Sequence, residues 1–104
     1  MKKLTALFLA ILLTLSMISG IAAEEKIRVG FANINERGSF GKMVRQNMID
    51  TAQERGYELI AVDNNSDGAT AVANADTLLA MNIDYMIEFN VDTSVAPVIM
   101  EKFN

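Results

Sequence analysis

The feature that most limits how this chain can fold is the regular alternation of apolar runs with amphipathic segments from residue 26 onward. Short runs rich in β-branched and aromatic residues cover 26–33, 57–62 and 84–89. Segments with apolar residues every three or four positions follow them over 40–55, 69–81 and 95–103. The runs are typical of strands, and the spacing is typical of one face of a helix. The alternation predicts a three-layer α/β fold of order βαβαβα, with a parallel sheet and helical crossovers.

Polar residues and one glycine mark the expected ends of these helices. Side chains that can accept hydrogen bonds from free N–H groups at the helix starts are Ser39, Asp67 or Thr70, and Ser94. Residues that tolerate the left-handed conformation at the helix ends are Gly56 and Asn82. The helices are therefore expected to begin and end close to these positions.

Residues 1–23 differ in character from the rest of the chain. Two lysines precede an uncharged, leucine-rich stretch over 4–18, and small residues follow it. This is the pattern of a cleaved secretory signal peptide. The alternative is an uncleaved membrane anchor, although the apolar run is shorter than the roughly 20 residues that a span needs. We expect residues 24–104 to form the domain, outside the membrane, in the periplasm or the extracellular space.

Composition excludes several kinds of chemistry. The chain has no cysteine and no histidine, so thiolate and imidazole metal sites, haem and iron–sulfur attachment, and Ser-His-Asp or cysteine nucleophiles are excluded. The net charge of −4 argues against nucleic acid as a partner, because phosphate binding needs a basic surface. We expect no metal, no cofactor and no nucleic-acid partner.

The sheet topology predicts where a ligand would bind. Ligands of open parallel sheets bind beyond the carboxyl ends of the strands, where the strand order reverses. If the order is second, first, third, the reversal lies between the strands over 26–33 and 84–89. Candidate contacts in the loops there are Asn33, Asn35, Glu36, Phe40, Asn90 and Asp92. Amides donate and accept hydrogen bonds and carboxylates accept them, which suits a polyhydroxylated ligand such as a sugar, with the Phe40 ring against its apolar face.

Simpler interpretations of the same residues remain open. Asn and Asp are ordinary turn residues, because their side chains bond to nearby backbone. Phe40 could be the first core residue of its helix, packed on Val44 four positions later. The cluster over 63–68 is expected to be a plain turn, and Glu88 is expected to lie near an exposed edge of the sheet.

Four stretches carry a resemblance to a known family, and they read KIRVGFAN, ERGYEL, IAVDNNSD and NADTLLAMNIDYMIEFNVD. They are similar to the sugar-binding proteins of ABC transporters, the ribose/galactose-type members of the LacI-like, type I periplasmic binding proteins. The resemblance spans Lys26 to Asn104. Asn82 stands where relatives usually have glycine, and asparagine also tolerates the left-handed conformation.

The resemblance implies two α/β lobes that close over a sugar and then dock on a membrane permease. Positions that it matches to ligand contacts or places near them are Asn90, Phe40, Asn33, Asn35, Glu36 and Asp92. Family members run to roughly 300 residues, as two lobes of ordinary domain size require. Residues 24–104 are therefore expected to be a partial N-terminal lobe, a truncated product that binds its sugar weakly.

Two other functions stay open on the sequence alone. The chain could be a non-functional fragment that binds no ligand. It could also be a small exported hydrolase, since carboxylates can act as general acid and base. Glu36 and Asp92 would then form a pair of the glycosidase kind. Binding without catalysis is the expected activity.

Overall fold

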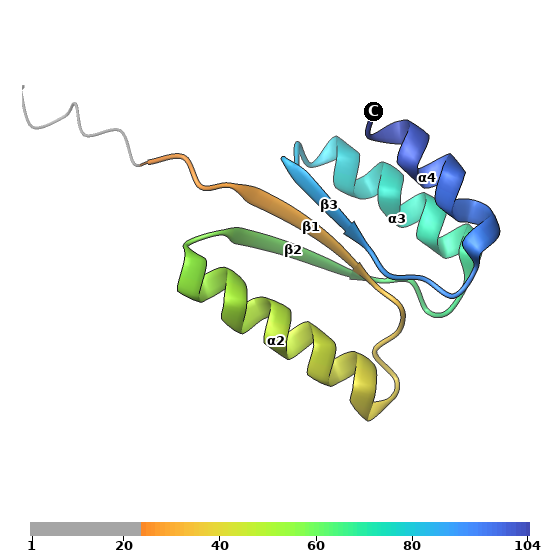
Figure 1. Ribbon diagram of the computed structural model, residues 1–104, viewed down its shortest axis with the longest axis horizontal. Coiled ribbons are helices and arrows are strands. Elements are labelled where there is room, and N and C mark those ends of the chain that lie inside the picture. Colours follow the sequence, from red (N-terminus) through yellow and green to blue (C-terminus); the bar gives the residue numbers. More distant parts are fainter. Residues whose placement is uncertain (1–23) are drawn as a thin grey trace, which may run out of the picture.

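A computed structural model describes residues 24–104, so the signal peptide predicted over 1–23 lies outside the described residues. The described residues form a parallel sheet of three strands, β1 (Arg28–Asn33), β2 (Glu58–Asp63) and β3 (Tyr85–Glu88). The strand order is β2-β1-β3 (Figure 1). The parallel α/β fold is as the sequence predicts, and the strand order is the one assumed above in placing the ligand.

Helices cover both faces of the sheet. The helices in this part of the chain are α2 (Ser39–Arg55), α3 (Gly68–Ala80) and α4 (Ala96–Lys102), and a 3-10 turn, η2 (Thr93–Val95), precedes the last. Helix α2 lies along one face, over β1 and β2, while α3 and α4 lie together on the other (Figure 1). The first crossover runs from β1 to β2, and the second runs back from β2 past β1 to β3. Because right-handed crossovers that run in opposite directions across a sheet lie on opposite faces, α2 and α3 are separated by the sheet.

The core forms on both sides of the central strand. Phe31 of β1 is 1% exposed, and Leu78 of α3 is fully buried. A Cβ added at Gly30 of β1 would lie 3.3 Å from Cδ1 of Leu78 and 2.6 Å from Cδ1 of Ile83, so this position faces α3 at close range. Alternation along β1 therefore sends Phe31 toward α2 and its neighbours toward α3.

Three of the predicted helix ends are confirmed. Gly56 ends α2 with a φ of 71°, and Asn82 follows α3 with a φ of 55°. At the start of α3, the Asp67 carboxylate accepts a hydrogen bond from the Thr70 backbone N–H at 2.8 Å. Local chemistry therefore determined where these helices stop and where α3 begins.

Two predicted caps are wrong. Ser39 is itself the first residue of α2, and the cap position is taken by Gly38, which has no side chain that could accept a hydrogen bond. Ser94 lies inside η2 and donates its backbone N–H to the Asp92 carboxylate at 3.0 Å. The side-chain cap at Asp92 therefore belongs to the 3-10 turn, and α4 follows Val95 without a side-chain cap of its own.

Candidate functional site

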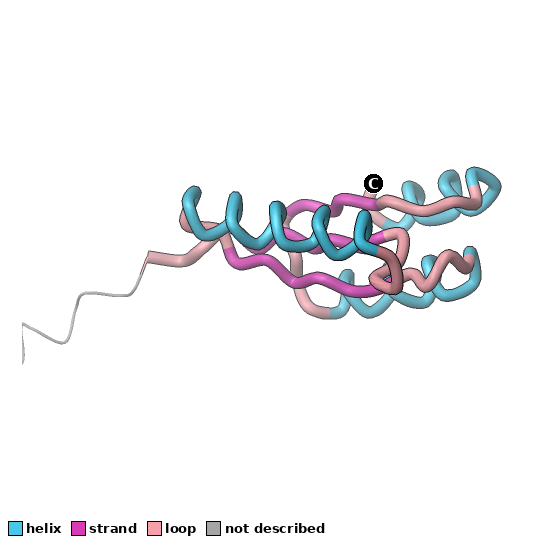
Figure 2. The backbone as a smooth tube through the Cα atoms, turned by 90° about the horizontal axis from the view of Figure 1, so that it is seen from below, coloured by secondary structure: helices cyan, strands magenta, loops and turns pink. Residues whose placement is uncertain are grey.

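The loops that follow the three strands gather at one end of the sheet (Figures 1 and 2). Backbone bonds join the first two of these loops. The Asn64 N–H donates to the Asn33 carbonyl, and the Ser66 N–H donates to the Ile34 carbonyl, both at 2.8 Å. We call this end, with the loops over 34–38, 64–67 and 89–92, the carboxyl edge.

A series of hydrogen bonds among three amide side chains and one carboxylate crosses the carboxyl edge from one outer strand to the other. The fully buried Asn64 donates from Nδ2 to Glu88 Oε1 at 2.7 Å and to the Phe89 carbonyl at 3.3 Å. Asn74 of α3 donates to Asn64 Oδ1 at 2.9 Å, and Asn90 donates to Glu88 Oε1 at 3.1 Å. These four side chains, Asn64, Asn74, Glu88 and Asn90, form what we call the amide network. It ties the loops after β2 and β3 together over the end of β1.

The environments of Asn64 and Glu88 correct one expectation from the sequence and refine another. The segment over 63–68 is more than a plain turn, because Asn64 bonds to residues more than 20 positions away. Glu88 lies on β3, an outer strand of the sheet, as expected. It is nevertheless partly buried, and its Oε2 is buried with no hydrogen-bond partner among residues 24–104. Burial raises the pKa of the Glu88 carboxyl, and the hydrogen bonds from Asn90 and Asn64 lower it in part.

Asn90 and Asp92 are held in place by the loop that they belong to. Asn90 Oδ1 accepts from the Asp92 backbone N–H at 2.8 Å. The Asp92 carboxylate accepts from the Ser94 hydroxyl at 2.6 Å as well as from its N–H, and these bonds lower the pKa of Asp92. Asp92 therefore caps η2, while Asn90 keeps one amide hydrogen and one lone pair free of these bonds.

The candidate residues of the first loop have different environments. Asn33 is fully buried and donates to the Gly41 carbonyl at 2.9 Å, while its Oδ1 has no partner within the described part of the chain. Asn35 is partly exposed and donates to the Ser66 hydroxyl at 2.8 Å. Asn33 is thus placed to hold the start of α2, and Asn35 is placed to reach a ligand.

Glu36 is already engaged in an ion pair. Its carboxylate bonds to the Arg45 guanidinium on α2, so the pair brings no net charge to the carboxyl edge. The two carboxylates considered above as a catalytic pair, Glu36 and Asp92, are each bonded to a neighbour on their own side of the edge.

Two aromatic rings meet at the carboxyl edge. Phe40 in the first turn of α2 and Phe89 directly after β3 have ring centroids 6.3 Å apart and planes inclined by 76°, an edge-to-face arrangement. Phe40 is 57% exposed, so it is not a core residue of its helix. The structure therefore brings Phe40 and Asn90 to the same end of the molecule. The sequence analysis did not identify Phe89 as a candidate site residue. Its position immediately after a strand is the signal that could have identified it.

A hollow larger than the one at the carboxyl edge lies elsewhere in the described residues. It measures about 540 Å³ at the amino ends of the strands, lined by Glu25, Lys26, Ile27, Arg28, Asn82, Asp84 and Tyr85. A hollow of about 260 Å³ lies at the carboxyl edge, where Glu88 and Asn90 meet α4.

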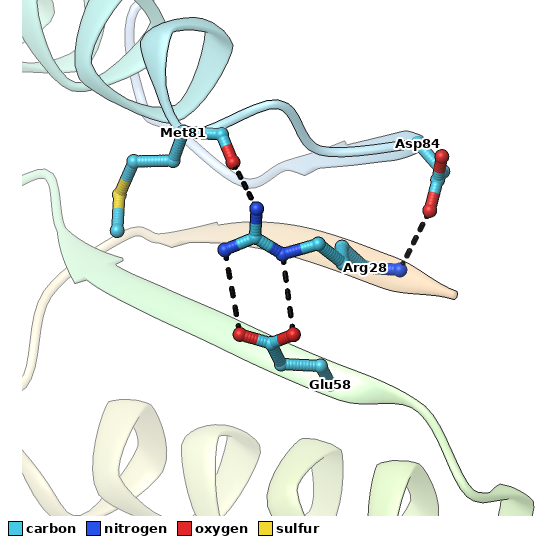
Figure 3. Close-up of polar contacts among 4 residues, drawn as sticks. All are labelled: Arg28, Glu58, Met81 and Asp84. Carbon is cyan, nitrogen blue, oxygen red and sulfur yellow. Dashed lines mark hydrogen bonds and ion pairs between the residues drawn. The ribbon is translucent and has the colours of Figure 1, made fainter. Parts of the chain in front are cut away.

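Polar groups at the amino end are engaged with one another. Figure 3 shows the Arg28 guanidinium between Glu58 of β2 and the Met81 carbonyl at the end of α3. Its Nε lies 3.2 Å from Glu58 Oε2, and the Arg28 backbone N–H donates to Asp84 at 2.8 Å. Arg28 thus joins β1 to β2 and to the end of α3. We assign this cluster a structural role and place the candidate site at the carboxyl edge.

Two further features bear on the kind of site. Over residues 24–104, no three side chains of the His, Cys, Asp and Glu types are grouped so that they could hold a metal ion. Within the same range, no helix has the length and apolar character needed to cross a membrane.

Comparison with known proteins finds one informative similarity. The chain is 33% identical over 78 residues to the ribose import binding protein RbsB of Haemophilus influenzae. The match covers 75% of this chain and 26% of that protein, so the chain spans about a quarter of the relative's length. No family model matches the chain, and no solved structure matches it.

Proposed function

We propose that this chain is the sugar-binding component of an ABC transporter, and that residues 24–104 form part of the N-terminal lobe of a ribose/galactose-type periplasmic binding protein. The observation that carries the proposal is the meeting of Phe40, Phe89, Asn35 and Asn90 at the carboxyl edge of a parallel sheet. Similarity to a ribose import binding protein supports a sugar as the ligand.

The chemistry of the carboxyl edge suits a neutral polyol. The exposed Phe40 ring offers an apolar surface to the C–H face of a sugar. Asn35 and Asn90 each keep hydrogen-bonding capacity beyond their internal bonds, and amides serve hydroxyl groups as donor and as acceptor. Glu36 and Arg45 form an ion pair, so the Arg45 guanidinium is not free to bind an acidic sugar.

The affinity should be modest. The described residues supply the loops of a single α/β unit, so the sugar is contacted from one side and retains much of its hydration. We expect a Kd of about 1 mM, which corresponds to about −4 kcal/mol. In the cell, residues 1–23 would direct export to the periplasm or beyond, and a membrane permease would be the partner.

We propose that the chain is not an enzyme. The carboxylates of Glu36 and Asp92 are each held by a hydrogen-bonded neighbour, so neither member of the pair considered for glycosidase chemistry is free to act on a substrate. A non-functional fragment remains the alternative, and ligand binding separates the two.

Calorimetric titration of the full chain with D-ribose, D-galactose and D-glucuronate tests the proposal. We expect saturable binding of at least one neutral sugar, and binding about tenfold weaker in Asn90→Ala because a direct hydrogen bond to the sugar is lost. Glu101→Ala, on the exposed side of α4, is the matched control and should bind like the wild type. Failure to bind both D-ribose and D-galactose, or equal weakening of binding by the two substitutions, would contradict the proposal.

A further inference from the structure

Glu88 is an unusual residue to find at the end of a packed strand. It pairs in register with the fully buried Ala32 of the central strand, and one of its carboxylate oxygens is buried without a partner among the described residues. A carboxylate in such a place is destabilising unless hydrogen bonds compensate for its lost hydration. An apolar side chain would fill the same position without that loss.

The compensation comes from two amides on different loops. Glu88 Oε1 accepts from Asn64 Nδ2 at 2.7 Å and from Asn90 Nδ2 at 3.1 Å. Asn64 follows β2, and Asn90 follows β3. These are the two outer strands of the sheet, so a single oxygen atom joins loops that the central strand separates.

We propose that Glu88 is a positioning residue of the carboxyl edge, which fixes the direction of the Asn90 amide and the place of the loop after β2. The inference rests on the proposed function, because it assigns Glu88 a role in presenting Asn90 to the sugar.

The bonding of Asn90 explains how the direction is fixed. Its Nδ2 donates to Glu88, and its Oδ1 accepts from the Asp92 backbone N–H at 2.8 Å. Rotating the amide by half a turn would place an oxygen against the carboxylate and an N–H against another N–H. The second Nδ2 hydrogen and the second Oδ1 lone pair of Asn90 are therefore held in fixed directions. A binding group that is fixed before the ligand arrives loses less freedom on binding.

The place of the loop after β2 depends on the same oxygen. Asn64 also accepts from Asn74 of α3 at 2.9 Å, so the network runs from α3 through Asn64 to Glu88. Ser66 in this loop is the partner of Asn35. Displacement of Asn64 would therefore also move Ser66, and with it Asn35, the second amide that we place in the site.

The test compares Glu88→Ala and Glu88→Gln with the wild type, with the exposed Glu101→Ala as the matched control. Glutamine keeps an oxygen that can accept from both amides, and alanine does not. In the full chain, the side-chain amide resonances of Asn64 and Asn90 report on the network, and calorimetry with D-ribose reports on binding. We expect Glu88→Ala to move both resonances toward free-amide positions and to weaken binding about tenfold. Glu88→Gln should keep both properties within about threefold of the wild type.

Two results would overturn the positioning role. Loss of binding in Glu88→Gln with both amide resonances unmoved would mean that the carboxylate touches the sugar directly. Unmoved resonances in Glu88→Ala would mean that the network does not hold these amides. Absence of ribose binding by the wild type would instead contradict the proposed sugar, and the amide resonances would still decide whether the network exists.

A measurement on the wild type covers the case in which Glu88→Ala does not fold. The Asn64 and Asn90 amide resonances should shift together with pH, with one shared midpoint, because both bond to one titrating oxygen. The exposed Asn47 amide of α2 should not follow them. Separate midpoints for the two amides, or a pH-independent spectrum across the titration of carboxyl groups, would overturn the assignment.

Discussion

Replacement of Gly41 by alanine should destabilise the fold through the loop that carries the candidate site. Gly41 lies in the first turn of α2 and is buried. A Cβ built there would overlap the backbone oxygen of Asn35 and lie 2.8 Å from its carbonyl carbon. Because the obstacle is backbone rather than a flexible side-chain end, either the loop or the helix start has to move.

The magnitude follows from three contributions. Overpacking at such a contact costs about 1–3 kcal/mol. The movement also breaks the buried bond from Asn33 to the Gly41 carbonyl, and an unsatisfied buried amide costs about 1–3 kcal/mol. Alanine returns about 1 kcal/mol through its better helix propensity. The free energy of unfolding should fall by about 3 kcal/mol in Gly41→Ala.

Chemical denaturation monitored by circular dichroism measures this change, with Gly38→Ala as the matched control. Gly38 has a φ of −93°, and a Cβ built there has no heavy atom of residues 24–104 within 4 Å beyond Gly38 and its two chain neighbours. Its replacement should cost less than about 1 kcal/mol, the usual effect of alanine at a helix start. Equal stability of the two variants would refute the close approach of α2 to the Asn35 loop.

Three further predictions concern the site, the pH dependence and the amino end. Phe40→Ala should weaken D-ribose binding about tenfold in calorimetry while lowering the melting temperature only moderately, because the ring is 57% exposed and loses little beyond its edge-to-face contact with Phe89. The free energy of unfolding should fall as pH rises from the ordinary Glu value of 4.5 through the raised pKa of Glu88, since the folded state binds that proton more tightly. Hydrogen bonds from Thr70 and Ser94 lower the pKa values of Asp67 and Asp92. The contribution of these two carboxylates to the free energy of unfolding is therefore lost as pH falls below about 3.8. Arg28→Ala should cost about 1–2 kcal/mol in denaturation, the sum of a half-exposed ion pair and one bond to a helix-end carbonyl.

Each of these predictions has a contradicting outcome. Loss of folding in Phe40→Ala would make the ring a core residue. A fall in unfolding free energy that persists unchanged in Glu88→Gln between pH 4.5 and neutrality would assign the pH dependence to another group. An Arg28→Ala variant with wild-type stability would mean that the amino-end cluster adds nothing to the fold.

The sequence predicted those parts of the fold that depend on local pattern. Apolar spacing identified the three strands and three helices, and the chemistry of Gly56, Asp67 and Asn82 marked ends that the structure confirms. Ser39 failed as a cap because a serine can cap a helix or begin one, and the difference depends on the path of the preceding loop. The spacing of apolar residues in the sequence does not determine the path of that loop.

The candidate site was predictable as a place and less so as a set of contacts. The topology rule brought Phe40 and Asn90 to one end, where the structure has both. The amide network joins Asn64 to Glu88 across 24 positions, and nothing in the local sequence of either residue indicates such a bond. Asn33 is a partial exception, because alternation from Phe31 places its side chain on the face that α2 covers.

The central claim is that the carboxyl edge binds a sugar, and a titration of the full chain with D-ribose, followed residue by residue in backbone amide spectra, tests it most directly. We predict saturable shifts confined to the loops over 33–40, 64–66 and 89–92, with a Kd of about 1 mM. Shifts centred on Lys26 and Tyr85 at the amino-end hollow, or no saturable shifts at sugar concentrations well above that Kd, would contradict the account.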